Sequence, residues 1–177
     1  LDIALGYQHR GVERVLLGGP DQRTVHYMET LAGDTTIGHA VTYAQVIEGL
    51  ANIQAPLRAA AIRSIMLELE RLANHAGDLG ALANDVGYLP TASYCGRLRG
   101  DFLNMTALIC GNRFGRNLIR PGGVLFDLDQ DMIQELDDRL EKTFRDVKNA
   151  VSLLWDSALV VDRFDETGIL TRQQALD

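Results

Sequence analysis

Five ionisable residues recur at helical spacing near the middle of the chain. They are Glu68, Arg71, His75, Asp78 and Asp85, at intervals of three, four, three and seven residues. Such intervals place them on one face of an α-helix. Acid, base and imidazole groups in a row can relay protons when burial shifts their pKa values. The alternative is a solvent-exposed row with an ordinary surface pair, but much of the remaining circumference is apolar, which favours burial of part of the row.

Two shorter clusters precede this row. His9, Arg10 and Glu13 fall within about one helical turn, a spacing at which charged pairs are more often structural than catalytic. The stretch from 29 to 39 combines a helix end, a glycine, a capping residue and a new helix start. A lone imidazole such as His39 near a helix start usually packs or caps, so this stretch by itself indicates geometry rather than chemistry.

Composition limits the function classes. The chain has 177 residues, 46% of them apolar and 23% charged, which is the balance of one globular domain. Its net charge of -7 gives no electrostatic support for binding nucleic acid or anionic lipid. No apolar stretch reaches the roughly 20 residues that cross a bilayer. We interpret both cysteines, Cys95 and Cys110, as buried apolar side chains.

Hydrophobic periodicity predicts an all-α fold, a bundle of long helices in a single domain over residues 1–177. The expected helices cover residues 5–17, 21–32, 36–51, 56–86, 92–113 and 130–160. Asp34 or Thr35 is the expected N-cap of the third, and Asp129 of the last. Because the sequence opens abruptly on Leu1, we expect it to be a segment excised from a longer chain.

Two of these clusters resemble the amino-terminal signature of [NiFe]-hydrogenase large subunits. Arg10-Gly11-Val12-Glu13 matches Arg-Gly-x-Glu, and the stretch from 29 to 39 matches Glu-Arg-x-Cys-Gly-x-Cys-x-x-x-His in order and spacing. Ala32 and Thr35 stand where that family has its two cysteines. A nickel–iron centre depends on such thiolate ligands, so we expect no nickel–iron site and no hydrogen activation.

The same segments resemble the quinone-pocket subunit of respiratory complex I. His9-Arg10-Gly11-Val12-Glu13 matches its His-Arg-Gly-x-Glu, and the stretches from 68 to 75 and from 85 to 87 are similar to that family too. The resemblance implies that Asp85 supports a quinone-binding histidine from a loop upstream of Leu1. It also places the family's quinone-contacting tyrosine at or near Gly33. The loop from 106 to 124 looks closest to the membrane-bound, formate-hydrogenlyase-like branch.

This resemblance implies an electron- and proton-transfer oxidoreductase subunit of a hydrogenase-like or NADH:quinone dehydrogenase-like membrane complex. The catalytic candidates are Glu13, His75 and Asp85, the cofactor-binding candidates are His9, Arg10 and His39, and no metal ligand is expected. We expect quinone and a neighbouring subunit's iron–sulfur cluster in the parent complex, and no cofactor on this fragment alone.

The expected partners are an iron–sulfur small subunit and membrane subunits, with the assembly on the cytoplasmic face of the cell membrane. The fragment is expected to be inactive alone and to self-associate through apolar faces that its partners would cover. Two alternatives stay open: a non-catalytic scaffold that keeps the large-subunit fold, and a metal enzyme with an altered site around Asp34 and His39. A Gly-x-Gly-x-x-Gly loop is absent, so no nucleotide is placed on this chain.

Overall fold

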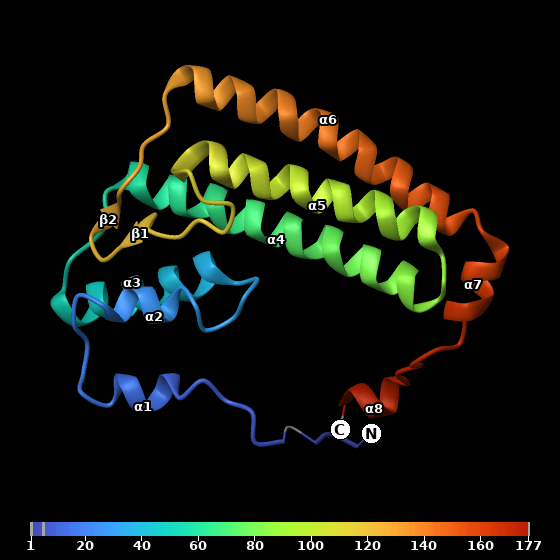
Figure 1. The fold of residues 1–177 in the computed structure, drawn as a ribbon, viewed down its shortest axis with the longest axis horizontal. Helices are drawn as coiled ribbons and strands as arrows, with labels where there is room; N and C mark the ends of the chain where they lie inside the picture. Colours follow the sequence, from blue (N-terminus) through green and yellow to red (C-terminus); the bar gives the residue numbers. More distant parts are fainter. Residues whose placement is uncertain (1, 5, 177) are drawn as a thin grey trace.

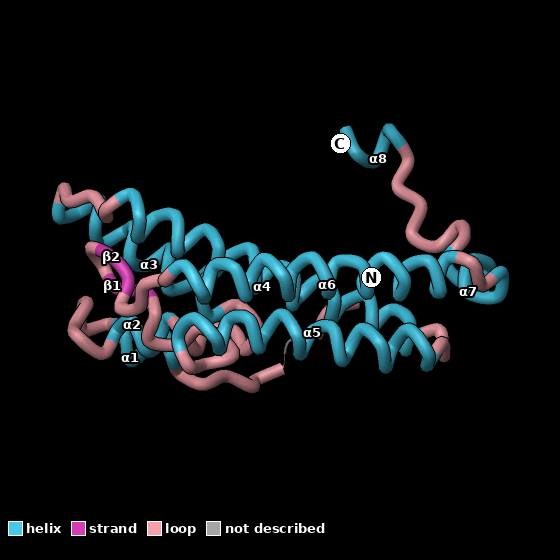
Figure 2. The backbone as a smooth tube through the Cα atoms, turned by 90° about the horizontal axis from the view of Figure 1, so that it is seen from above, coloured by secondary structure: helices cyan, strands magenta, loops and turns pink. Residues whose placement is uncertain are grey.

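Three long helices form the body of the protein. The computed structural model describes residues 2–4 and 6–176, and within them α4 (Leu57–Asp85), α5 (Leu89–Cys110) and α6 (Gln130–Trp155) run side by side. Figure 1 shows α5 between the other two, and α5 contacts both along its length. Figure 2 shows the three from above, running side by side, with most of the shorter elements at the end where α4 begins.

The shorter elements lie mainly beside the first half of α4. They are α1 (Val12–Leu16), α2 (Thr24–Met28), α3 (Thr36–Ala51), the antiparallel strands β1 (Ile119–Arg120) and β2 (Gly123–Val124), α7 (Ala158–Phe164) and α8 (Arg172–Leu176). α3 packs against α2, α4 and β1, and β2 contacts α4. α7 follows α6 at the opposite end of the long helices (Figure 1).

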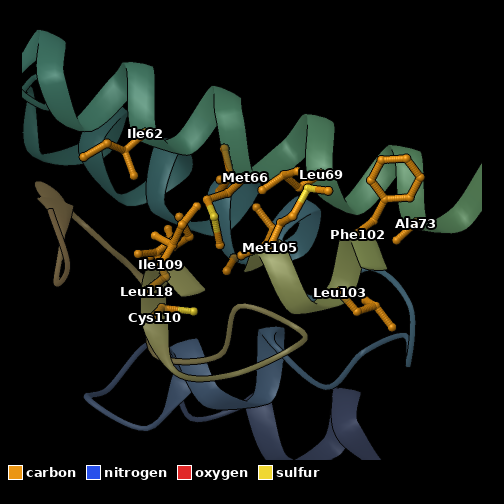
Figure 3. Close-up of a cluster of buried hydrophobic side chains, with 14 of the residues drawn as sticks. Ile62, Met66, Leu69, Ala73, Phe102, Leu103, Met105, Ile109, Cys110 and Leu118 are labelled. Carbon is orange, nitrogen blue, oxygen red and sulfur yellow. The ribbon is translucent and has the colours of Figure 1, made fainter. Parts of the chain in front are cut away.

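The core lies chiefly between α4 and α5. Figure 3 shows Ile62, Met66, Leu69 and Ala73 of α4 facing Phe102, Met105 and Ile109 of α5. All seven are at most 3% exposed, and the α4 residues recur at intervals of four and three, the period of one helix face. This face fixes the rotation of α4 and therefore decides which of its polar residues reach solvent.

A buried ion pair attaches the β-hairpin to the helices. The Arg63 guanidinium of α4 donates to the Glu48 carboxylate of α3 at 2.6 and 3.1 Å, and to the carbonyl oxygens of Arg120 and Gly123 at 2.8 and 3.0 Å. The Gly122 amide donates to the same carboxylate at 2.7 Å. The hydrogen bond from Arg63 holds the pKa of Glu48 below its ordinary value despite burial. One polar cluster thus joins α3, α4 and both strands.

The predicted helical fold is largely confirmed, because the described chain is mostly helical, with two strands of two residues each. The hairpin was not predicted, since strands this short leave no alternating pattern. The prediction of 36–51 as a helix is correct. Asp129 caps α6 as predicted, its carboxylate accepting from the Met132 amide at 2.8 Å.

Several helix boundaries were predicted wrongly, each for a local reason. The helix expected over 5–17 begins only at Val12, after Gly11 in the left-handed region at φ 66°. Leu5 lies outside the described residues. The helix expected over 21–32 spans only Thr24–Met28. The fifth begins at Leu89, since Pro90 occupies its first turn without breaking it, and ends before Gly111.

The helix expected over 130–160 is two helices. α6 ends at Trp155, and Ser157 adopts an extended conformation before α7 begins. This bend brings Val160 into a small buried cluster with Ala83 and Leu154, where the turn between α4 and α5 also packs. The apolar residues continue at helical spacing through the bend, which is why periodicity alone extended the helix.

Candidate functional site

A polar hollow lies where the start of α3 meets the middle of α4. Three adjacent depressions share Asn74 of α4, and we call their union the Asn74 hollow. The segment before and at the start of α3 forms one wall, the polar face of α4 forms the floor, and Arg99 of α5 forms part of the other wall. Besides Asn74, four residues border two of the three depressions, and they are Asp34, Glu70, Asp78 and Arg99; Gly38 and His75 border one.

Glu70 of α4 supplies the cap of α3 from another helix. Its two carboxylate oxygens accept hydrogen bonds from the backbone amides of Ile37 and Gly38, at 2.7 and 2.9 Å. These amides belong to the first turn, where helical N–H groups have no partner within the helix. Thr35, one of the two predicted caps, does occupy the N-cap position of α3, but its side chain makes no capping hydrogen bond, and Glu70 supplies one instead.

Burial raises the pKa of the Glu70 carboxyl above its ordinary value. The two amide hydrogen bonds and the neighbouring His39 act in the opposite direction, but they offset the lost solvation only in part. A carboxylate in this setting takes up a proton more readily than an exposed glutamate does. Glu70 therefore borders the Asn74 hollow with a pKa that the fold raises.

The segment before α3 is also held at Asp34. The Asn74 side-chain amide donates to the Asp34 carbonyl oxygen at 2.9 Å, and the Arg99 guanidinium donates to its carboxylate at 2.9 Å. Gly77 makes room for Arg99, because a Cβ there would lie 3.0 Å from the arginine Cδ. The Asp34 carboxylate is thus engaged by a cation of α5.

The other end of this segment, at Glu29, is hydrogen-bonded to the loop between α5 and β1. Glu29 is 3% exposed, and its carboxylate accepts from the Asn117 amide at 2.8 Å. Its carbonyl oxygen accepts from the Thr36 hydroxyl at 3.1 Å. The Arg10 guanidinium donates to the carbonyl oxygens of Thr30 and Leu31. We call residues 30–38 the tethered loop, since side chains from three other segments hold it: the amino-terminal segment, α4 and α5.

The predicted burial of the charged row on α4 is wrong. Glu68, Arg71, His75, Asp78 and Asp85 are all exposed. The opposite face of α4 packs on α5, so this row points to solvent, and Glu68 and Arg71 form the exposed i,i+3 pair that was the alternative interpretation. A buried proton relay along α4 is therefore absent from the described residues of this chain taken alone.

The six predicted site residues do not meet at one place in this chain. His75 borders the Asn74 hollow, and half-buried His39 lies on the first turns of α3 near Glu70. Glu13 on α1 and Asp85 at the end of α4 lie at opposite ends of the molecule (Figure 1). His9 is exposed, and Arg10 contacts the tethered loop. The roles predicted for all six stay predictions.

Sequence reasoning missed the residues that build the hollow. Glu70, Asn74 and Gly77 recur at intervals of four and three, one residue away from the charged row, so their spacing was visible, but the charged row beside them was interpreted as the site. Arg99 had no local signal, since its partner lies 65 residues earlier.

Metal-ligating side chains are not gathered in the described part of the chain. No group of three or more His, Cys, Asp or Glu residues there is arranged to hold a metal ion. Cys95 and Cys110 are both buried, and burial raises the pKa of each thiol. Among the described helices, none is both long and apolar enough to cross a membrane.

These features define a helical protein in which a tethered loop borders a polar hollow on a three-helix body. Residues 85–177 match the family model of the respiratory-chain NADH dehydrogenase, 49 Kd subunit. That match covers more than half of the chain, and the chain belongs to this family.

Curated relatives cover the rest of the sequence, and each is a D subunit of an NADH-quinone oxidoreductase. The relative from Campylobacter jejuni is 31% identical over 98% of this chain and 42% of its own length. The second such protein of Solibacter usitatus is 31% identical over 98% of this chain and 47% of its own length. The relative from Clostridium beijerinckii is 30% identical over 97% of this chain and 46% of its own length. The chain therefore spans somewhat less than half the length of these relatives.

Proposed function

We propose that the chain is the helical core of an oxidoreductase subunit that transfers electrons and protons to a quinone within a multi-subunit complex. The observation that carries the proposal is the family membership together with the position of the tethered loop. By sequence resemblance this loop holds the region where related subunits contact quinone, around Gly33. In this fold the loop borders the Asn74 hollow, while Ile37 near its end packs into the apolar core.

The hollow has side chains suited to a quinone head group. A quinone carbonyl accepts hydrogen bonds, and its reduction requires protons, so imidazole and carboxyl groups are appropriate neighbours. His75 borders the hollow, and no hydrogen bond engages its ring within the described residues. We propose His75 as a proton donor and His39 as a second contact. Arg10 is better suited to positioning the tethered loop than to touching the quinone, because both its hydrogen bonds go to loop carbonyls.

We further propose that this subunit has no nickel–iron centre. Ala32 and Thr35 offer no thiolate, and the side chains of Cys95 and Cys110 lie in the core rather than at the loop. A soft metal requires thiolate ligands that can reach a common point. The residues that surround the tethered loop do not provide them, so electron transfer would use a cluster carried by a neighbouring subunit.

Exposed apolar side chains support a role within an assembly. Leu153 and Trp155 of α6 and Leu159 of α7 are 44, 69 and 70% exposed in this chain. Clusters of large apolar side chains on a surface indicate contacts with other protein surfaces. We propose an iron–sulfur subunit and membrane subunits as partners, with the chain peripheral on the inner face of the cell membrane.

Substitutions in the assembled complex test the proposal. In the full-length subunit, Glu13→Gln and Asp85→Asn should each lower quinone reduction at least about tenfold, as expected when a positioned proton-transfer group is lost. Asp137→Asn, an exposed change on α6, is the control and should retain turnover. Normal turnover in both test variants, with the complex assembled, would overturn the proposed catalytic roles.

The scaffold alternative has specific observations in its favour. Gly33 occupies the place where the resemblance puts a quinone-contacting tyrosine, and Ala32 and Thr35 replace the two cysteines. A scaffold predicts that the complex assembles and turns over regardless of Glu13 and Asp85. The similarity of the loop from 106 to 124 to the formate-hydrogenlyase-like branch stays a prediction.

A further inference from the structure

Glu70 of α4 has no role in the proposed function. It lies on α4 one residue from the exposed charged row, yet it is half-buried and borders two of the three depressions of the Asn74 hollow. Its carboxylate reaches across to the first turn of α3, where it accepts from the backbone amides of Ile37 and Gly38 at 2.7 and 2.9 Å. A residue of α4 thus controls the start of another helix.

The geometry points to Glu70 as a proton-responsive positioning residue. We propose that its ionised carboxylate holds the end of the tethered loop against the Asn74 hollow, and that protonation releases this hold. The inference rests on the proposed function only in the claim that the loop faces a quinone.

The chemistry follows from the two hydrogen bonds. Both carboxylate oxygens act as acceptors, one for the Ile37 amide and one for the Gly38 amide. When one oxygen takes up a proton from the solvent, it becomes an O–H donor and a much poorer acceptor for the N–H group that points at it. One amide of the first turn of α3 is then held only weakly, and the other hydrogen bond also becomes weaker because the acceptor is no longer charged.

The remaining anchors explain why release would be local. Asn74 and Arg99 still hold Asp34, and Thr36 still donates to the Glu29 carbonyl oxygen. The protonation-sensitive part is therefore the short stretch at Ile37 and Gly38. Burial favours the proton on Glu70, which agrees with this role.

Other charged groups surround Glu70, and their own charges affect how its protonation depends on pH. They are His39 on α3, Asp34 before it, Glu68, Arg71, His75 and Asp78 on α4, Arg99 on α5 and Arg113 after α5. His39 acts directly on Glu70, since a positive imidazole favours the ionised carboxylate. The test must therefore isolate Glu70 by substitution rather than by pH alone.

The experiment is amide hydrogen exchange in the full-length subunit within its assembled complex. The probe is the peptide spanning residues 36–42, with rates corrected for the intrinsic pH dependence of exchange. Glu70→Gln is compared with Glu135→Gln, the same change at an exposed i,i+4 pair on α6. In the wild type and in Glu135→Gln, protection should fall at least about threefold between roughly pH 7.5 and roughly pH 4.5, because the pKa of Glu70 is raised above the ordinary value and protonation weakens its hydrogen bonds.

In Glu70→Gln this pH dependence should disappear. An identical pH-dependent loss of protection in Glu70→Gln, or constant protection in the wild type, would overturn the proposal. Steady-state kinetics adds a second measurement: Glu70→Gln should raise the KM for a short-chain quinone several-fold more than it changes kcat. An unchanged KM would refute the positioning role. A complex that does not reduce quinone would instead refute the proposed function, while the exchange result would still decide the role of Glu70.

Discussion

Replacing Glu48 by glutamine should destabilise the chain far more than its size change suggests. The substitution keeps the side-chain volume but removes the charge that faces Arg63. The two side chains are 8 and 6% exposed, so the guanidinium would stay buried without a counter-charge. Removing one partner of a buried ion pair typically costs about 3–5 kcal/mol, and we expect a loss of about 3 kcal/mol because the glutamine oxygen still accepts one hydrogen bond.

Urea denaturation followed by far-UV circular dichroism measures this loss. The matched control is Glu68→Gln, which removes the same charge from the exposed pair with Arg71 and should cost less than about 1 kcal/mol. Replacing both buried partners, as Glu48→Gln with Arg63→Met, should cost less than the sum of the two single changes. A Glu48→Gln loss below about 1 kcal/mol, equal to the control, would refute the argument that the buried pair attaches the hairpin.

The Glu48–Arg63 pair also predicts how the stability of the fold changes with pH. Because Arg63 holds the pKa of Glu48 below its ordinary value, ionised Glu48 stabilises the fold at pH values above its unfolded-state pKa, about 4.3. This contribution is lost as the pH falls through the lower folded-state pKa. The stability difference between the wild type and Glu48→Gln should therefore shrink in acid. A difference that stays constant would contradict the assigned cause.

Three further predictions concern packing, capping and burial. Gly115→Ala should cost roughly 3 kcal/mol or more in urea denaturation, since its Cβ would lie 2.3 Å from Ile37 Cδ1 at φ 71°, whereas Gly111→Ala has the same φ without a nearby atom and should cost only about 1–2 kcal/mol; equal losses would refute the steric argument. Asp129→Ala should cost about 1 kcal/mol through loss of the α6 cap, and no change would show that the cap is dispensable. Both buried cysteines should react with iodoacetamide at neutral pH only after denaturation, as mass spectrometry would detect, and rapid labelling of the native chain would contradict their burial.

The long helices could be predicted from the sequence because apolar residues recur at intervals of three and four along each of them. α3 was predicted with its observed bounds, and Asp129 was identified as a cap from its position alone. The boundaries failed where glycine or a bend overrides periodicity, as at Gly11 and Ser157. These features depend on backbone conformation and on packing against distant helices, and a local sequence pattern predicts neither.

The site was predicted less well, because it depends on pairs that are distant in sequence. The charged row on α4 is real, but the rotation of the helix is set by its apolar contacts with α5, and the row faces solvent. Glu70 and Arg99 are assigned a role only when their partners, 33 and 65 residues away, are known. The resemblance drew attention to the tethered loop, while its anchors came from the structure.

We propose above all that this chain forms part of a quinone-linked oxidoreductase subunit without a nickel site. Metal and quinone analysis of the full-length protein, purified with its neighbouring subunits, tests this most directly. We predict iron from clusters of the neighbouring subunits together with bound quinone, and no nickel. Nickel in stoichiometric amount would contradict the interpretation of Ala32 and Thr35, and iron without quinone would favour the scaffold.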